Sequence, residues 1–288
     1  MDVPGGLPAD PLRRFLVAHA VPGAERFDAA TGTHERVVPT AAGPVAAAVV
    51  LGAGERCERV LVRAPAPVLG EVAGLVRRWL DLDGGVAAAE AHLRADPSLA
   101  ALVAARPGLR VPRSVSGAET ALLTVLGQQV SLAAARTFAG RLVAAHGRPA
   151  GEGLLAFPDP GALAAAGPDA LRAVTGLTGA RSRALHALAE LLAGGLDLDA
   201  AREAGEGPAA RERLLEVRGV GPWTADCVAL RVLGEDDAFL PGDLVLRAAM
   251  GRVSPAQALA RAQGWRPWRG YALLHLWTAH AFAGVTGG

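Results

Sequence analysis

The sequence has no lysine, asparagine or isoleucine, so all 29 of its basic residues are arginine. The codons of the three missing residue types are rich in A and T, and a GC-rich genome is the simplest explanation for their absence. Without lysine, no side chain carries a primary amine that could form a Schiff base with a carbonyl compound. The sequence therefore excludes enzymes whose nucleophile is a lysine.

Cysteine is almost as scarce, with only Cys57 and Cys227 in 288 residues. Two cysteines so far apart provide neither a disulfide framework nor the paired spacing of a zinc site. They also cannot supply the four thiolates that hold an iron–sulfur cluster. We therefore expect no metal site of these kinds and no such cofactor.

Long hydrophobic runs are missing, although 51% of the residues are hydrophobic. The most apolar segment, 45–51, is far too short to span a bilayer. The first ten residues lack the basic and apolar regions of a signal peptide. We therefore expect a cytoplasmic protein that does not enter membranes. The length of 288 residues allows two or three compact units with a sizeable core.

The formal net charge of +1 at pH 7 neither indicates nor excludes binding to nucleic acid. Binding to a duplex depends on a local basic face, which the total charge does not report. Several arginines flank the motifs described below and are candidates for phosphate contacts, although each also fits an ordinary surface position: Arg110, Arg113, Arg218, Arg252, Arg266 and Arg269.

Residues 1–92 combine strand and helix signals and are predicted to form a small antiparallel α/β domain. Segments that alternate in polarity or are rich in β-branched residues predict strands over 36–39, 45–51 and 59–64. Helical spacing of apolar residues predicts helices over 11–20 and 69–80.

The remainder, 93–288, consists of helical patterns joined by short turns that contain glycine and proline. Helices are expected over 116–126, 132–145, 160–165, 168–173, 181–193, 208–217 and 223–233. The predicted fold class is therefore α+β, with a small N-terminal domain followed by an all-α body.

The sequence Gly219-Val220-Gly221 separates two of these helices. Two glycines allow a sharp turn and the close approach of another backbone, and the following Pro222 suits the first position of a helix. The unpaired N–H groups of such a turn would suit a phosphate oxygen. From this spacing alone, a plain packing corner between two helices is the commoner explanation.

Asp243 follows Pro241-Gly242 and precedes an apolar run, a setting typical of a helix N-cap. A carboxylate in this place would also be kept ionised by the helix dipole, so capping and a chemical role are compatible. Asp236 and Asp237, a few residues earlier, are predicted to form a solvated acidic loop.

Three segments, LLEVRGVGPWTADCVALR, FLPGDLVLR and WRPWRGYALLHLW, resemble in order and spacing the helix-hairpin-helix (HhH-GPD) DNA glycosylase superfamily. The likeness is closest to the 3-methyladenine DNA glycosylase II (AlkA) family. It continues upstream through RPGLRVPRSVSGAETALLTVLGQQVSLAAARTFAGRLVAAHG and weakens over about the first ninety residues. It implies two helical subdomains, 117–235 and 93–116 with 236–288, and a cleft beside the hairpin and the aspartate.

The resemblance implies that a damaged base is flipped out of duplex DNA into an aromatic pocket. Trp223, Trp277 and Phe15 match pocket positions, and the tryptophan faces would attract a positively charged alkylpurine. Core packing is the alternative explanation for each ring. Asp243 matches the carboxylate that stabilises the oxocarbenium sugar and orients the attacking water.

The resemblance also assigns a set of DNA contacts to the hairpin, its flanks and the turn GQQVS: Gly219, Val220, Gly221, Pro222, Thr224, Arg218, Gln128 and Gln129. A monovalent cation between hairpin carbonyls and phosphate is a further implication. Two positions depart from the AlkA pattern. Gln129 replaces the leucine wedge, and Cys227 replaces a tyrosine, which predicts a roomier base pocket.

Lyases of the superfamily carry a lysine where this chain has Trp223, so the resemblance predicts a monofunctional glycosylase that leaves an abasic site. The expected substrate is double-stranded DNA with alkylated bases such as 3-methyladenine and 7-methylguanine, bound by a monomer. Two alternatives remain open. One is a glycosylase for an oxidised or deaminated base, and the other is a non-catalytic binder of damaged DNA. Asp243 counts against the second, because an anchor alone needs no carboxylate facing a phosphodiester backbone.

Overall fold

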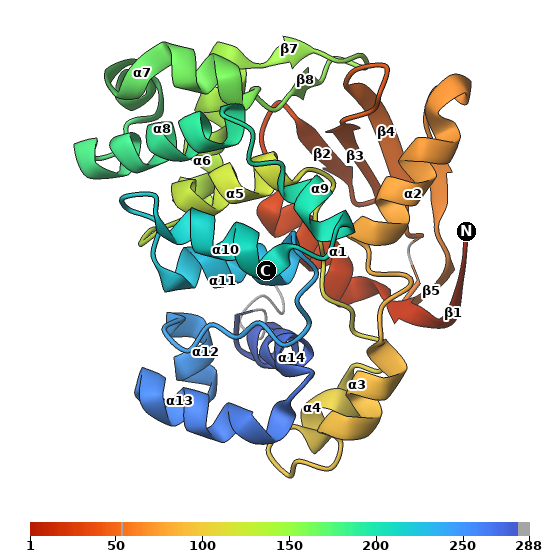
Figure 1. Cartoon of the computed structure of the whole chain (residues 1–288). Helices are drawn as coiled ribbons and strands as arrows, with labels where there is room; N and C mark the ends of the chain where they lie inside the picture. Colours follow the sequence, from red (N-terminus) through yellow and green to blue (C-terminus); the bar gives the residue numbers. More distant parts are fainter. Residues whose placement is uncertain (53, 282–288) are drawn as a thin grey trace.

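The structure is a computed structural model that describes residues 1–52 and 54–281. A region of antiparallel strands at the N-terminus is followed by a helical body (Figure 1). The strands are β1 (Asp2–Pro8), β2 (Glu25–Asp28), β3 (Thr33–Val38), β4 (Val45–Val50), β5 (Arg56–Arg59), β6 (Leu61–Arg63), β7 (Arg148–Pro149) and β8 (Leu155–Ala156).

The helices of the N-terminal half are α1 (Ala9–His19), α2 (Leu69–Trp79), α3 (Val86–Leu93), α4 (Ala100–Ala105), α5 (Gly117–Leu126) and α6 (Leu132–His146). Those of the C-terminal half are α7 (Pro160–Thr175), α8 (Gly179–Ala193), α9 (Leu198–Glu203), α10 (Gly207–Leu215), α11 (Pro222–Arg231), α12 (Leu244–Ala249), α13 (Pro255–Arg261) and α14 (Arg269–Ala281). Short 3₁₀ turns precede α2 (Ala66–Val68) and follow α13 (Ala262–Trp265).

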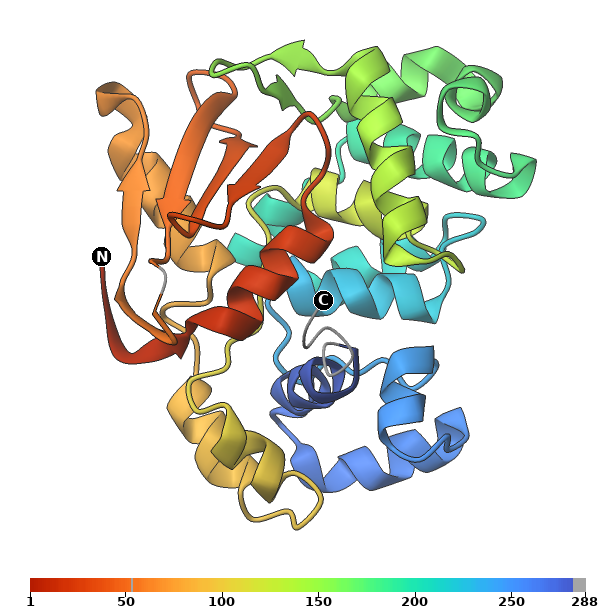
Figure 2. The ribbon, with the colours of Figure 1, turned by 180° about the vertical axis from the view of Figure 1, so that it is seen from behind.

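The main sheet has four antiparallel strands in the order β2-β3-β4-β6. Strands β1 and β5 form a separate antiparallel pair, and so do β7 and β8. Helix α2 covers the sheet with Val72 and Val76, which are spaced one turn apart and fully buried against Val38 and Val49. Helix α1 contacts α6 and lies between the sheet and the helical body (Figure 2).

The helical body has two hydrophobic cores. One is formed mainly by α5 to α11, and the other joins α3 and α4 to α12, α13 and α14. Figures 1 and 2 show α3 and α4 beside α14, although these segments are far apart in sequence. Helix α11 belongs to both cores, because Val228 and Ala229 pack in the first while Cys227 and Leu230 pack in the second. Its side chains therefore lie at the junction of the two halves.

The predicted fold class is confirmed, since antiparallel strands precede a helical body. The short pair β7 and β8 lies within that body and was not predicted. The expected helices are present with ends displaced by a few residues. The predicted segments 160–165 and 168–173 form α7, which is interrupted at Gly167, where φ is 80° and ψ is 160°. Among the residues described, no helix has the length and apolar character needed to cross a bilayer.

The strand predictions were less accurate. The predicted strand 59–64 is observed as β6, which begins at Leu61, because Arg59 ends β5 and pairs with Asp2 in another sheet. Strands β1, β2 and β5 were not predicted. β1 contains Gly5 and Gly6, residues that favour turns, and its register with β5 is interrupted. The predicted domain boundary at residue 92 falls near the end of α3, whose Ala89 and Leu93 pack with Trp265.

Candidate active site

The glycine hairpin joins α10 to α11, as predicted, and Gly219 is required at its corner. Gly219 has a φ of +97°, and a Cβ there would lie 2.6 Å from the Cβ of Ala184 on α8. The next side chain, Val220, is only 5% exposed and fixes the hairpin in the first core. Packing of Val220 and the close approach of Ala184 therefore hold the turn from beneath.

Main-chain N–H groups on the outer side of the hairpin have no protein acceptor. Within the described ranges, the amides of Gly219, Gly221, Trp223 and Thr224 donate to no carbonyl or side chain. Gly221 is the N-cap of α11, and a Cβ there would have no heavy atom within 4 Å. This open surface with unpaired donors at a helix N-terminus suits an anion.

Gln128 ties the GQQVS turn, between α5 and α6, to the hairpin. Its Nε2 donates to the carbonyl oxygen of Gly219 at 3.0 Å and to the hydroxyl of Thr224 at 2.9 Å. The Thr224 side chain is buried, so these two predicted DNA contacts are used within the protein. The next residue, Gln129, is exposed and has a φ of 54°. The bridge therefore presents Gln129 to solvent beside the hairpin.

Asp243 is the N-cap of α12, as predicted, and its carboxylate accepts three hydrogen bonds. Oδ1 accepts from the amide of Leu246 at 2.8 Å and from Nε1 of Trp277 at 2.9 Å, while Oδ2 accepts from Nε1 of Trp223 at 3.0 Å. Asp243 is 9% exposed. The two indoles come from α11 and α14, so the carboxylate orientation is fixed from both halves of the body.

A single cavity of about 520 Å³ brings the predicted pocket residues together. Asp243, Trp223, Trp277, Cys227 and Phe15 all line it. Trp223 and Cys227 are one turn apart on α11, so they face the same side of the helix. Burial raises the pKa of the Cys227 thiol to about 11, so the pocket wall is neutral here.

The same cavity extends to a group of ionisable residues that sequence reasoning missed: His19, Glu25, Arg36, Glu119 and Arg231. Arg36 pairs with Glu119 at 2.7 Å and with Glu25 at 3.7 Å, and its guanidinium lies 5.0 Å from the ring centre of Trp79. Burial and the neighbouring Arg231 guanidinium lower the pKa of His19 to about 4. The sequence contained a signal for two of these residues. His19 follows Phe15, and Arg231 follows Cys227, by four residues, so each pair lies on one face of its helix.

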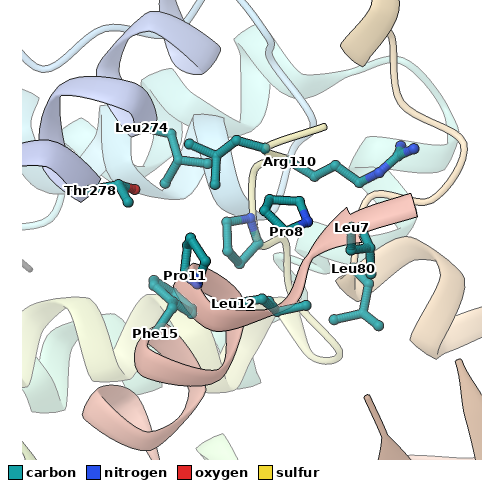
Figure 3. Close-up of a pocket in the computed structure, with 11 residues that line it drawn as sticks. Leu7, Pro8, Pro11, Leu12, Phe15, Leu80, Arg110, Leu274 and Thr278 are labelled. Atoms are coloured by element: carbon teal, nitrogen blue, oxygen red, sulfur yellow. The ribbon is translucent and has the colours of Figure 1, made fainter. Parts of the chain in front are cut away.

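Phe15 also lines a second, much smaller cavity. This cavity, of about 20 Å³, has room for roughly one water molecule. Figure 3 shows Pro11, Leu12 and Phe15 of α1 facing Leu274 and Thr278 of α14 across it. Phe15 and Leu274 also line the large cavity. Phe15 and Leu274 are therefore shared by the walls of the two cavities.

Two of the arginines considered for phosphate contacts are buried, so that prediction is wrong for them. Arg110 is 8% exposed and donates to the carbonyls of Asp81 and Leu82. Arg113 is 7% exposed and pairs with Asp81 and Asp236. A guanidinium that is buried and paired cannot reach a DNA phosphate.

The loop aspartates are also paired rather than simply solvated. Asp237 binds Arg269 through two hydrogen bonds of 2.8 Å and pairs with Arg266 at 2.9 Å. Arg218, at the hairpin, and Arg252 are exposed. These two remain available for contact with an anion.

The resemblance implies a monovalent cation at the hairpin carbonyls. The carbonyl of Val217 accepts the amide of Val220, and that of Gly219 accepts Gln128. Each oxygen keeps a second lone pair that could bind a cation. The cation itself stays a prediction.

Comparison with known proteins identifies related families over most of the chain. The AlkA N-terminal domain family matches residues 5–116, and the HhH-GPD superfamily of base excision DNA repair proteins matches residues 122–267. A probable bifunctional transcriptional activator/DNA repair enzyme AlkA of Mycobacterium tuberculosis is 46% identical over 211 residues, 70% of this chain and 41% of that protein. DNA-3-methyladenine glycosylase 2 of Escherichia coli is 39% identical over 62% of this chain and 64% of its own length.

The chain thus aligns with less than two thirds of the length of these relatives. Among solved structures, a 3-methyladenine DNA-glycosylase from Archaeoglobus fulgidus shares the fold over 99% of both chains, with a TM-score of 0.83 and 22% identity. The fold is therefore shared over essentially the entire chain.

Proposed function

The chain belongs to the HhH-GPD superfamily of base excision DNA repair proteins, and we propose that it is a monofunctional DNA glycosylase for alkylated purines. The substrate class is duplex DNA that contains bases such as 3-methyladenine and 7-methylguanine. The named relatives from E. coli and M. tuberculosis support a repair enzyme of this kind.

The observation that carries the proposal is the environment of Asp243. Its carboxylate lies in the large cavity, is nearly buried and accepts N–H groups from two tryptophans. Cleavage of the glycosidic bond leaves positive charge on the sugar, which a fixed carboxylate in a dry site stabilises. The same carboxylate can orient the water that attacks C1′.

Trp223 and Trp277 have two roles in this proposal. The sequence suggested that their faces attract a cationic base, and their position on the cavity wall supports that role. Their Nε1 groups also hold the two oxygens of Asp243. A flipped base would therefore meet aromatic surface next to the carboxylate that acts on its sugar.

The approach to DNA uses the hairpin and the neighbouring turn. The free amides around Gly221 would bind a backbone phosphate, and the exposed Gln129 would enter the space that the flipped base leaves. The Gln128 bridge joins these two contacts, so anchoring and insertion occur at a fixed separation. A glutamine can fill this space and also form hydrogen bonds with the unpaired base.

Strand cleavage by a Schiff base is not part of the proposed mechanism. The lyase position is occupied by Trp223, whose N–H is bonded to Asp243, and the sequence has no lysine. Hydrolysis by water would leave an intact abasic site.

The test is release of bases from methylated duplex DNA by the wild-type protein and by Asp243→Asn. Wild type should release 3-methyladenine and 7-methylguanine and leave unbroken strands, with no adduct trapped by borohydride. Asp243→Asn retains a capping side chain but loses the charge, so single-turnover excision should fall at least about 100-fold while DNA binding persists. The matched control is Asp159→Asn, which changes the N-cap of α7 outside the cavity. Equal rates for Asp243→Asn and wild type would exclude the assigned role.

A further inference from the structure

The base cavity runs along α11 from the catalytic carboxylate to Arg231. Trp223, Cys227 and Arg231 follow one another at intervals of four residues and all line the cavity. With a rise of 1.5 Å per residue, Arg231 lies about 12 Å beyond Trp223 along the helix axis. The thiol of Cys227 lies between them and is subject to the charges of both Asp243 and Arg231. A small side chain at 227 therefore leaves the two ends of the cavity connected.

At the far end of the cavity, His19 provides a hydrogen-bond acceptor, and the contact of its other ring nitrogen shows which nitrogen this is. Nδ1 of His19 lies 2.8 Å from the carbonyl oxygen of Phe15. A carbonyl can only accept, so Nδ1 carries the proton. With its pKa near 4, the ring is neutral at pH 7 and Nε2 holds a lone pair. In the part of the chain that the structure describes, Nε2 has no partner, and His19 lines the cavity.

The same end also contains donors without acceptors. Nε of Arg231 donates to the carbonyl of Pro112 at 3.1 Å, and its guanidinium lies 5.1 Å from the ring centre of Phe15. Among the residues described, its two terminal nitrogens have no acceptor. His19 stacks on Phe15 with ring centres 4.0 Å apart, so Phe15 brings the donor and the acceptor together.

Three guanidinium groups and two carboxylates lie at this end of the cavity. Arg36 pairs with Glu119 and Glu25, whereas among the described residues Arg136 and Arg231 line the cavity without a carboxylate partner. The formal charge of this end therefore has an excess of one positive charge, which favours a base edge that presents hydrogen-bond acceptors.

We infer that Arg231 and His19 read the edge of the flipped purine opposite its sugar, which reaches them past Cys227. The guanidinium donates to an acceptor at N1 or position 6, and a neighbouring N–H of the base donates to Nε2 of His19. This inference rests on the proposed glycosylase function and specifies its selectivity: purines that pair an acceptor with an N–H donor on this edge are preferred. 7-Methylguanine has this pair in O6 and N1–H, and 3-methyladenine has it in N1 and the 6-amino group.

The test compares two bases that differ in whether this edge carries an N–H donor for His19. Hypoxanthine offers an acceptor at O6 and a donor at N1–H, whereas unsubstituted purine offers an acceptor at N1 and no donor on this edge. Each is placed at one site in the same duplex, and single-turnover excision is measured. His19→Phe keeps the stacked ring and removes the acceptor, so the ratio of hypoxanthine to purine excision should fall about tenfold, the worth of one hydrogen bond.

Three further variants separate recognition from a structural effect. His19→Gln restores an acceptor and should recover most of the ratio. His92→Phe, on the exposed side of α3, should leave the ratio unchanged. Cys227→Tyr fills the connection between the two ends of the cavity. In a Cys227→Tyr background, the ratio of hypoxanthine to purine excision should therefore no longer depend on His19. An equal loss of both activities in His19→Phe, or a His19 effect that persists with Cys227→Tyr, would overturn the inference.

Binding measurements keep this test independent of catalysis. The same two duplexes with 2′-fluoro sugars resist cleavage, and wild type should bind the hypoxanthine duplex more tightly than the purine duplex by a margin that His19→Phe abolishes. Equal affinities for wild type would overturn the inference even if methylated bases are excised. Failure to excise any methylated base, with the binding preference intact, would instead overturn the proposed function.

Discussion

The side-chain amide of Gln128 is hydrogen-bonded to the carbonyl oxygen of Gly219, a residue 91 positions later in the chain. The bond joins the turn that carries Gln129 to the corner of the hairpin, and the second bond of the same nitrogen goes to Thr224. The turn and the hairpin, which would both approach DNA, are thus joined directly by hydrogen bonds.

Gln128→Leu should weaken this connection while leaving the rest of the fold intact. Loss of the two hydrogen bonds is expected to lower the free energy of unfolding by about 1–3 kcal/mol. Excision from duplex DNA should fall more than excision from single strands, because only a duplex requires the insertion of Gln129. The control is Gln257→Leu, which breaks the capping box of α13 and should lower stability alone. Equal losses on single and double strands would contradict the bridging role.

The two glycines of the hairpin should respond differently to alanine. Gly219→Ala introduces a methyl at positive φ and 2.6 Å from Ala184, so we expect a loss of about 2 kcal/mol or more in unfolding free energy. Gly221→Ala meets open space and should cost about 1 kcal/mol or less as an N-cap change. Its methyl would instead obstruct a phosphate, so weaker DNA binding by a stable protein is expected. Denaturation and DNA titration of both variants check these outcomes.

Each of the tryptophans bound to Asp243 can be replaced by phenylalanine to separate its N–H from its ring. A hydrogen bond to a charged group contributes about 1.5–3 kcal/mol, so Trp223→Phe and Trp277→Phe should each slow single-turnover excision by roughly 10- to 100-fold. The control is Trp265→Phe. The indole of Trp265 donates to Asp96 at 2.6 Å, and this hydrogen bond lies outside the cavity. Full activity of the two phenylalanine variants would mean that only the aromatic faces matter.

Stability should decrease in mild acid because buried histidines resist protonation. Burial and the charge of Arg106 lower the pKa of His275 to about 4. Between pH 6.5 and 4 the unfolded chain therefore binds a proton that the folded chain does not, and stability falls as the pH is lowered through this range. For His275 the loss between pH 7 and pH 5 should be about 2 kcal/mol. Urea unfolding of His275→Leu should show a flatter pH dependence, and parallel curves for variant and wild type would refute this cause.

Much of the fold was predictable, because the helices are marked by local signals. Asp243 caps α12 and Pro222 begins α11 as the sequence suggested, and the helix expected from residue 116 begins at Gly117 with Ser116 as its N-cap. Strand β1 was not predictable in this way, since its glycines favour turns and its partner β5 lies about fifty residues away. Pairing between distant segments decided its structure.

The sequence identified the main residues of the candidate site but not the hydrogen bonds between them. Asp243, Trp223 and Trp277 were singled out, but the bonds from both indoles to the carboxylate depend on how α11 and α14 pack. Arg113 lies near the motifs in sequence, yet its carboxylate partner Asp81 is 32 residues away and could not be inferred. Long-range partners therefore decide which charged residues remain free for DNA.

The pairing of arginines with carboxylates has a consequence for association with DNA in salt. Arg110 and Arg113 are buried, and the hairpin offers one exposed arginine, Arg218, together with several uncharged main-chain N–H groups. Release of counterions scales with the number of phosphates neutralised by cationic side chains, at a slope of about −0.9 per contact. Neutral amide donors displace water instead of ions. In the proposed complex, the amides of the hairpin would therefore contribute affinity that persists at salt concentrations where an arginine-rich surface would release its DNA.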